Sequence, residues 1–174
     1  MQVFLIRHPR PRVDEGICYG QLDVDCEDPL PIAAALRAQI PAGTPVISSP
    51  LHRARCLAEA LNPAARIDPR LCEIHFGEWE GRAWHDIDRA SLDAWAANIL
   101  HFTPPGGESV ARLQARAIDF ACALETLDMP RVALVTHAGI LRALSGHWRQ
   151  LPLAEWTQLK FGFGSLTELN IPTP

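Results

Sequence analysis

Four basic residues each lie at or just beyond the end of a short apolar run in the sequence. They are Arg7, His8, Arg53 and His137. Short apolar runs that end at polar residues are typical of buried β-strands. When such strands are parallel neighbours, their carboxyl ends meet at one edge of the sheet, which is where ligands bind. The sequence therefore predicts that two arginines and two histidines converge on one small site.

The expected site favours an anion, and a phosphate group is the anion that suits it best. A helix is predicted to begin right after His137, and its first turn adds unpaired N–H groups and the positive end of a dipole. Clustered cations without an anion would repel one another, so we expect the anion to come from a ligand. A neutral histidine can also attack phosphorus and hold it covalently. The residue spacing matches neither a metal site nor a Walker loop, and we expect no metal and no cofactor.

The segments around these residues alternate between strand and helix patterns. Predicted strands cover residues 3–6, 45–49, 65–71, 131–137 and 165–171. Predicted helices cover residues 32–40, 50–61, 82–101, 108–124 and 138–144, with 82–101 as one helix or two. Ser49 is expected to cap the second helix, and Pro50 suits its first turn. This alternation predicts an α/β fold, a three-layer α/β/α sandwich with a mostly parallel central sheet, formed by a single domain over residues 1–174.

The composition excludes several classes of protein and partner. The 174 residues carry a formal net charge of −4, which argues against general binding to nucleic acid or to an anionic membrane. The five cysteines are odd in number and form no C-x-x-C pair, so we expect neither a disulfide framework nor a structural zinc site. No segment has the roughly 20 apolar residues that cross a bilayer. We expect a cytoplasmic protein whose partner is a small molecule, and the sequence does not indicate an oligomeric state.

Five short motifs resemble, in their order, those of the histidine phosphatase superfamily. Within it they are similar to the branch of cofactor-dependent phosphoglycerate mutases and small phosphatases. The motifs lie at residues 5–8 (LIRH), 48–54 (SSPLHRA), 71–81 (LCEIHFGEWEG), 105–109 (PGGES) and 135–139 (VTHAG). Together they span nearly the whole chain. The resemblance implies a phosphoglycerate mutase-like fold and a metal-independent phosphatase.

The resemblance also implies a role for each matching side chain. His8 would be the nucleophile that forms a phosphohistidine. Glu73 would protonate the leaving alkoxide and then deprotonate the attacking water. The residues that would bind the phosphoryl oxygens are Arg7, Arg53 and His137, and those that would contact the rest of the substrate are Gln21 and Ala138. Glu80 and Gly81 match a motif, and we interpret both as structural.

Two positions depart from the pattern of the superfamily. Most relatives have glycine after the nucleophilic histidine, where this chain has Pro9. Proline has no N–H, so a phosphate contact from that amide is not available here. Where relatives often have asparagine this chain has Asp14, and a carboxylate beside a phosphate is unfavourable unless Arg10 or Arg12 pairs with it. We therefore leave Asp14 outside the expected site.

Two further stretches bear on the substrate. Residues 16–24 and 102–109 resemble α-ribazole phosphatases, which remove the 5′-phosphate from a benzimidazole-type nucleotide in cobalamin biosynthesis. Phosphoglycerate mutases usually carry longer insertions, for which 174 residues leave little room. A mutase, or a sugar or nucleotide phosphatase of broad specificity, stays an alternative. A second alternative is a phospho-ligand binding domain that has lost catalysis, with Pro9 as the lesion.

Overall fold

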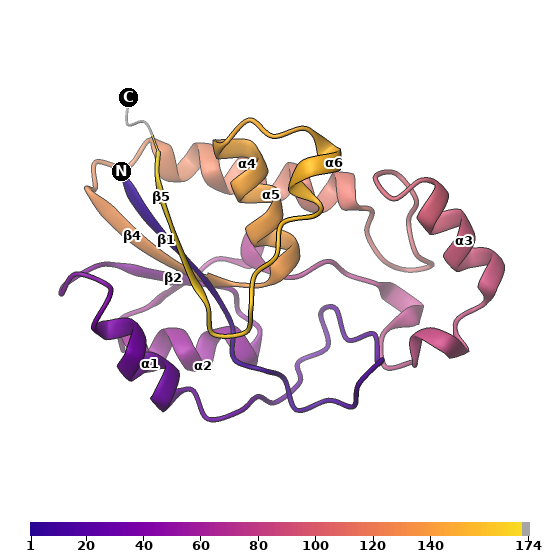
Figure 1. Cartoon of the computed structure of the whole chain (residues 1–174), viewed down its shortest axis with the longest axis horizontal. Helices are drawn as coiled ribbons and strands as arrows, with labels where there is room; N and C mark the ends of the chain where they lie inside the picture. Colours follow the sequence, from indigo (N-terminus) through magenta and orange to yellow (C-terminus); the bar gives the residue numbers. More distant parts are fainter. Residues whose placement is uncertain (172–174) are drawn as a thin grey trace.

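The computed structural model describes residues 1–171, which form a five-stranded sheet with helices on both faces (Figure 1). In chain order the strands are β1 (Gln2–Arg7), β2 (Val46–Ser48), β3 (Arg66–Ile67), β4 (Arg131–Thr136) and β5 (Leu166–Asn170). Their order in the sheet is β3-β2-β4-β1-β5. The pairings are parallel except for that of β5 with β1. The predicted α/β sandwich with a mostly parallel sheet is confirmed.

Helices cover both faces of this sheet, and one further helix lies beside the layers (Figure 1). The helices are α1 (Leu30–Arg37), α2 (His52–Leu61), α3 (Arg89–Ala97), α4 (Val110–Glu125), α5 (Ala138–Trp148) and α6 (Leu153–Trp156). Side chains alternate along a strand, so Phe4 and Ile6 of β1 pack with α1 and α2, whereas Val3 and Leu5 pack with α4 and α5. Figure 1 shows these helix groups on opposite sides of the sheet. Within residues 1–171, no helix has the length and apolar character needed to cross a bilayer.

The strand register places the carboxyl ends of the central strands at one edge. Arg7 pairs with Thr136, and Ser48 pairs with Val135, so β1, β4 and β2 end at nearly the same height. The backbone N–H of His8 donates to the Thr136 carbonyl at 3.0 Å and extends this alignment by one residue. The side chains that follow the three strands therefore meet at one edge, as the sequence predicted.

Three local expectations need correction. Ser49 does not cap the second helix, because α2 begins only at His52 and its N-cap residue, Leu51, has no capping side-chain bond. The strand predicted over 65–71 is limited to β3, since a 3₁₀ turn over Pro69–Leu71 ends it. The segment 82–101 contains a 3₁₀ turn over Trp84–Asp86 and the helix α3.

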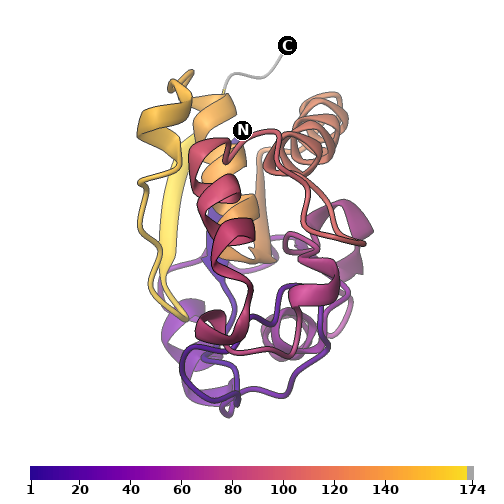
Figure 2. The same ribbon diagram turned by 90° about the vertical axis from the view of Figure 1, so that its right-hand side faces the viewer.

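An aromatic cluster supports the segment between β3 and α4. Trp79 is buried at its centre, and its packing partners include Phe76, Trp84, Trp95 and Phe102. The rings of Trp84 and Trp95 stack with centroids 5.8 Å apart. This cluster holds α3, which lies beside the layered part of the molecule in Figure 1 and faces the viewer in Figure 2. The sequence left open whether Phe76 and Trp79 shield the site or belong to a core, and Trp79 is a core residue.

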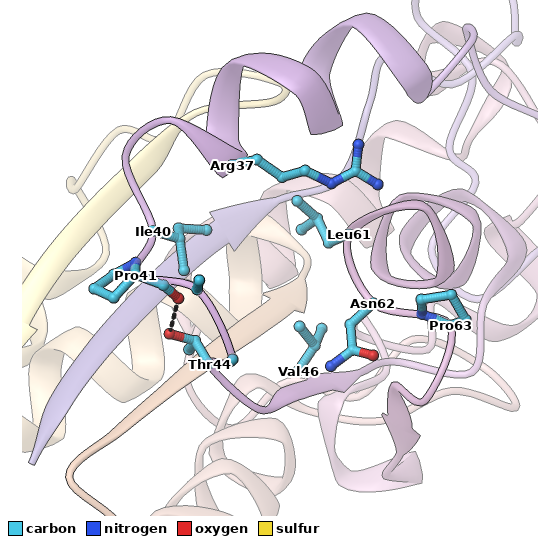
Figure 3. Close-up of a pocket in the computed structure, with 10 residues that line it drawn as sticks. Arg37, Ile40, Pro41, Thr44, Val46, Leu61, Asn62 and Pro63 are labelled. Carbon is cyan, nitrogen blue, oxygen red and sulfur yellow. Dashed lines mark hydrogen bonds between the residues drawn. The ribbon is translucent and has the colours of Figure 1, made fainter.

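A cavity of about 390 Å³ lies at the amino end of β2 (Figure 3). Arg37, Ile40, Val46 and Leu61 are among the residues that line it. In a parallel sheet the ligand crevice lies at the carboxyl ends of the strands, so this cavity is at the opposite end from His8. We assign it no part in the chemistry.

Candidate active site

His8 and His137 come from neighbouring parallel strands and face each other at the carboxyl edge of the sheet. Their ring centroids are 4.9 Å apart, and both side chains are buried. Arg7 and Arg53 are close enough for their charges to act on both imidazoles. The structure therefore brings together the four basic residues that the sequence singled out.

The buried His8 ring is neutral and holds one tautomer. Burial, together with the charge of Arg53, lowers its pKa to about 3. Its Nδ1 lies 2.6 Å from the Pro9 carbonyl oxygen. A carbonyl oxygen only accepts, so the proton is on Nδ1 and the lone pair of Nε2 is free to attack. Pro9 removes an N–H from the site, yet its carbonyl is the group that orients His8.

His137 is also neutral. Burial is the main cause of a pKa well below the usual histidine value, with Arg53 and His8 adding to it. Its Nε2 lies 2.8 Å from Ser49 Oγ, and this hydroxyl also accepts the N–H of Leu51 at 3.3 Å. When the Ser49 hydroxyl donates to Nε2, the ring proton of His137 is on Nδ1. Within residues 1–171, Nδ1 is buried and has no hydrogen-bond partner. A buried N–H without a partner in the protein can donate a hydrogen bond to an anionic oxygen of a ligand.

The two arginines are anchored by backbone carbonyls. Arg53 is fully buried and donates to Gly20 O at 2.5 Å and to Leu22 O at 2.8 Å. Arg7 donates to Phe161 O at 2.6 Å, and its guanidinium carbon lies 3.8 Å from the centre of the Phe163 ring.

These arginines carry positive charge that the protein does not neutralise by direct pairing. Within residues 1–171, neither guanidinium forms an ion pair with a carboxylate, and the Nε of each is buried without a hydrogen-bond partner. Removing one partner from a buried charge pair is strongly destabilising, so buried charges are as a rule matched. Here the natural match is a ligand with two or more anionic oxygens, as a phosphate has.

Glu73 lies beside the amino end of α5. Its carboxylate accepts the N–H of Ile74 at 3.0 Å and that of Gly139 at 3.2 Å. A side chain at Gly139 would collide with Glu73 Oε1, so the glycine permits this close approach. The charge of Glu73 acts on both Arg7 and Arg53, which places the carboxylate at the same site as the cations.

Gln21 and Ala138 are placed at the same site. Gln21 Nε2 donates to the Glu73 backbone carbonyl at 2.8 Å, and the backbone N–H of Gln21 donates to Glu80 Oε1 at 2.9 Å. Glu80 also accepts the Phe76 N–H at 2.8 Å, so it links two loops, in agreement with the structural role expected for it. Ala138 is buried in the first turn of α5. That Gln21 and Ala138 touch a substrate stays a prediction.

Arg116 on α4 is a positioning residue that the sequence did not indicate. Its guanidinium donates to Cys72 O at 2.6 Å and to Glu73 O at 2.9 Å, and it pairs with Glu108 at 2.6 Å. It thereby holds the backbone that carries Glu73. Its carbonyl partners lie 43 to 46 residues away in the sequence, so no local pattern could reveal them.

The residues left outside the site are exposed. Asp14 is exposed, and its expected partners have other carboxylates nearby. Arg10 lies 3.9 Å from Glu27, and Arg12 lies 3.7 Å from Asp25. These contacts give no sign that Asp14 belongs to the cationic cluster.

Acid is expected to destabilise the protein through the two neutral histidines. An unfolded chain protonates them near pH 6.5, whereas the folded chain keeps His8 neutral down to about pH 3. The unfolded state thus binds more protons in this window, and each histidine lowers stability by up to about 1.4 kcal/mol per pH unit as the pH falls. Urea unfolding between about pH 7.5 and about pH 4.5 measures the slope.

The matched variants separate these histidines from the other titrating groups. His8→Asn is expected to give a shallower loss of stability with falling pH, whereas His85→Asn, at an exposed position, leaves the slope unchanged. Equal slopes in all three proteins would contradict the neutral state of His8.

The fold and the site together define a class of protein. A mostly parallel α/β sheet presents a neutral, oriented histidine beside the buried Arg53 and the half-buried Arg7, neither of which pairs with a carboxylate within residues 1–171, and this arrangement suits a phosphoryl-transfer enzyme. A model of the histidine phosphatase superfamily (branch 1) matches residues 3–173, and the chain belongs to this superfamily.

Known proteins of this kind are similar to the chain over most of its length. A glucosyl-3-phosphoglycerate phosphatase of Mycolicibacterium vanbaalenii is 30% identical over 177 residues, covering 91% of this chain and 78% of that protein. An adenosylcobalamin/alpha-ribazole phosphatase of Salmonella typhimurium is 27% identical over 124 residues, covering 69% of this chain and 61% of that protein. The solved alpha-ribazole phosphatase of Shigella flexneri shares the fold, with a TM-score of 0.88 at 24% identity over 99% of this chain and 91% of that one.

Proposed function

We propose that this protein hydrolyses a small-molecule phosphomonoester through a phosphohistidine on His8, with no metal ion in the reaction. The observation that carries this proposal is the His8 ring, whose Nδ1–H is held by the Pro9 carbonyl at 2.6 Å. Its free Nε2 lies beside the cations that a phosphoryl group requires. The proline carbonyl takes part in this orientation, which favours a catalytic protein over a binding domain that has lost catalysis.

The first step transfers the phosphoryl group to His8. Nε2 forms a bond to phosphorus while the ester P–O bond breaks, and Glu73, which must enter this step as the carboxylic acid, gives its proton to the departing alkoxide oxygen. Arg7, Arg53 and His137 Nδ1–H hold the other three oxygens, where negative charge gathers in the transition state.

The second step releases inorganic phosphate. Glu73 is now a carboxylate and takes a proton from a water molecule that attacks phosphorus. The P–N bond breaks, and His8 returns to its neutral state with the proton still on Nδ1. The Pro9 carbonyl keeps the proton on Nδ1 throughout. Nε2 is therefore the nucleophile in the first step and the leaving group in the second.

A pocket beside Glu73 supports a substrate with an apolar, aromatic leaving group. It has a volume of about 230 Å³, and its lining includes Glu73, Gly139, Trp95 and Trp156. Whole ligand pockets usually measure about 300–1,000 Å³, so this one suits one ring system of a larger substrate. We propose α-ribazole 5′-phosphate, whose benzimidazole ring would occupy it.

Arg142 favours a second candidate. This half-buried arginine lines the same pocket, and its Nε donates to Leu159 O at 2.8 Å. A guanidinium at this place could bind the carboxylate of a phosphoglycerate-type substrate. The similarity to the mycobacterial glucosyl-3-phosphoglycerate phosphatases is in line with this alternative.

A panel of phosphomonoesters tests the proposed function. It contains a generic aryl phosphate, α-ribazole 5′-phosphate, glucosyl-3-phosphoglycerate, and 3-phosphoglycerate with its bisphosphate primer. We expect aryl phosphate turnover between about pH 5 and about pH 8, and the highest kcat/KM on α-ribazole 5′-phosphate. Phosphate binding without any turnover would overturn the proposal that the protein is an enzyme. A preference for glucosyl-3-phosphoglycerate or 3-phosphoglycerate would overturn the proposed substrate.

Replacing Trp95 by alanine is expected to weaken the binding of aromatic substrates selectively. Trp95→Ala removes one wall of the pocket, and we expect KM for α-ribazole 5′-phosphate to rise about tenfold, the effect of losing an aromatic contact. A small aliphatic phosphomonoester should show little change in KM. Leu92→Ala is the control, because Leu92 packs against the same aromatic cluster from α3 but does not line the pocket. Equal changes in both variants and on both substrates would contradict the pocket assignment.

A further inference from the structure

Three side chains outside the catalytic site come together where the loop after β1 meets α2. Cys26 Sγ and Cys56 Sγ are 3.1 Å apart, and one ring nitrogen of His52 completes a group whose ligand atoms lie within 4.8 Å of one another. His52 and Cys56 are one turn apart on α2, so they share a face of the helix. Cys26 reaches them from the loop, where it bridges to Pro11.

Two thiols and an imidazole are the ligand types that zinc prefers. With Zn–S bonds of about 2.3 Å, two thiolates on a tetrahedral zinc lie about 3.8 Å apart, so the sulfurs would separate by roughly 0.7 Å. Asp25 adds a carboxylate, since its Oδ1 lies 3.5 Å from His52 Nε2. A metal-bound histidine usually has a carboxylate close by, as a partner of the ring or as a further ligand.

We propose that Cys26, His52 and Cys56 bind a divalent cation of the zinc type, with Asp25 or water in the fourth position. The site is separate from the phosphate site and takes no part in the reaction. Because it depends on none of the catalytic assignments, it stands or falls independently of the proposed function.

A cation held by two thiols displaces their protons, so binding releases protons and strengthens as the pH rises.

Such a cation would stabilise the segment that anchors Arg53. This arginine directly follows His52 and donates to two carbonyls of the loop, those of Gly20 and Leu22. The Cys56 thiol lies 3.5 Å from the Arg53 carbonyl. A cation held by Cys26 from the loop and by His52 and Cys56 from α2 would join the two elements that position this guanidinium.

Zinc titration of the whole, reduced protein tests the proposal. After dialysis against a chelator, Zn²⁺ is added in competition with a chromophoric chelator, and we expect roughly one equivalent to bind. Co²⁺ in place of Zn²⁺ should give a thiolate-to-cobalt charge-transfer absorption. The Tm should rise with Zn²⁺, because a ligand that binds the folded state stabilises it.

Matched variants assign the ligands. Cys26→Ser and Cys56→Ser should each abolish the cobalt absorption, and His52→Ala, at a half-exposed position, should weaken zinc binding at least tenfold by loss of one ligand. Cys122→Ser removes an exposed cysteine elsewhere and should bind like the parent. Failure of the reduced parent protein to bind Zn²⁺, or unchanged binding in the Cys26→Ser/Cys56→Ser double variant, would overturn the site. So would a Cys26–Cys56 disulfide in air combined with no metal binding after reduction.

Discussion

Replacing His8 by alanine is expected to abolish phosphate release, with kcat falling on the order of 10⁴-fold or more. Without the imidazole no phosphoenzyme can form, and hydrolysis has to proceed by direct attack of water. The residues on either side, Arg7 and Pro9, have no nucleophilic side chain that could replace the imidazole. The remaining arginines can still bind the phosphate, so the loss should appear in kcat far more than in KM.

Rapid quenching provides the direct measurement. With a labelled phosphomonoester, the parent protein should yield an acid-labile, base-stable phosphoenzyme, and peptide mapping should place the label on His8. His85→Ala changes an exposed histidine and serves as the matched control, with turnover and labelling like the parent. Label on any other residue, or a His8→Ala variant with substantial turnover, would disprove the nucleophile assignment.

Glu73→Gln is expected to slow substrates according to their leaving groups. Alkyl phosphates need a proton on the departing oxygen, and loss of the acid should cost about 10²–10⁴-fold in the first step. Activated aryl phosphates leave as stable phenolates and should lose far less. The amide keeps the shape of the carboxylate, and its oxygen can still accept one of the two backbone N–H groups, that of Ile74 or that of Gly139, while the other loses its acceptor.

The two steps have to be measured apart, because every substrate leaves the same phosphoenzyme behind. Single-turnover formation of phosphohistidine gives the first step, and the decay of isolated phosphoenzyme gives the second. The second step should slow equally for all substrates, since Glu73 is then the base that activates water. Glu78→Gln, an exposed position in the same motif, is the control. Equal losses in the first step for alkyl and aryl substrates would rule out an acid role.

The main features of the sheet and the cationic cluster could be predicted from local patterns. The apolar runs before His8 and His137 are buried strands, and both side chains lie at the same edge of a parallel sheet. The boundaries near the site were harder to predict. Ser49 has the residue type of an N-cap, but α2 begins only at His52, and the Ser49 hydroxyl contacts His137 across 88 residues as well as the N–H of Leu51.

Other parts of the site depend on contacts that no local pattern encodes. Arg116 holds the backbone at Glu73 from another helix, and the pocket beside Glu73 is lined by residues from several distant segments. The proximity of Cys26, His52 and Cys56 was not expected from the sequence. Only the His52–Cys56 spacing of one helical turn was visible in the sequence.

The division between these two kinds of information has a physical basis. Strand and helix patterns follow from the burial of side chains at fixed intervals along the chain, so the sequence alone determines which residues end β1 and β4 and therefore where His8 and His137 lie. The tautomer of His8, the unpaired state of Arg7 and Arg53, and the walls of the leaving-group pocket depend on groups brought close by folding. Those distances are set by the packing of the layers, and the three-dimensional structure is what reveals them.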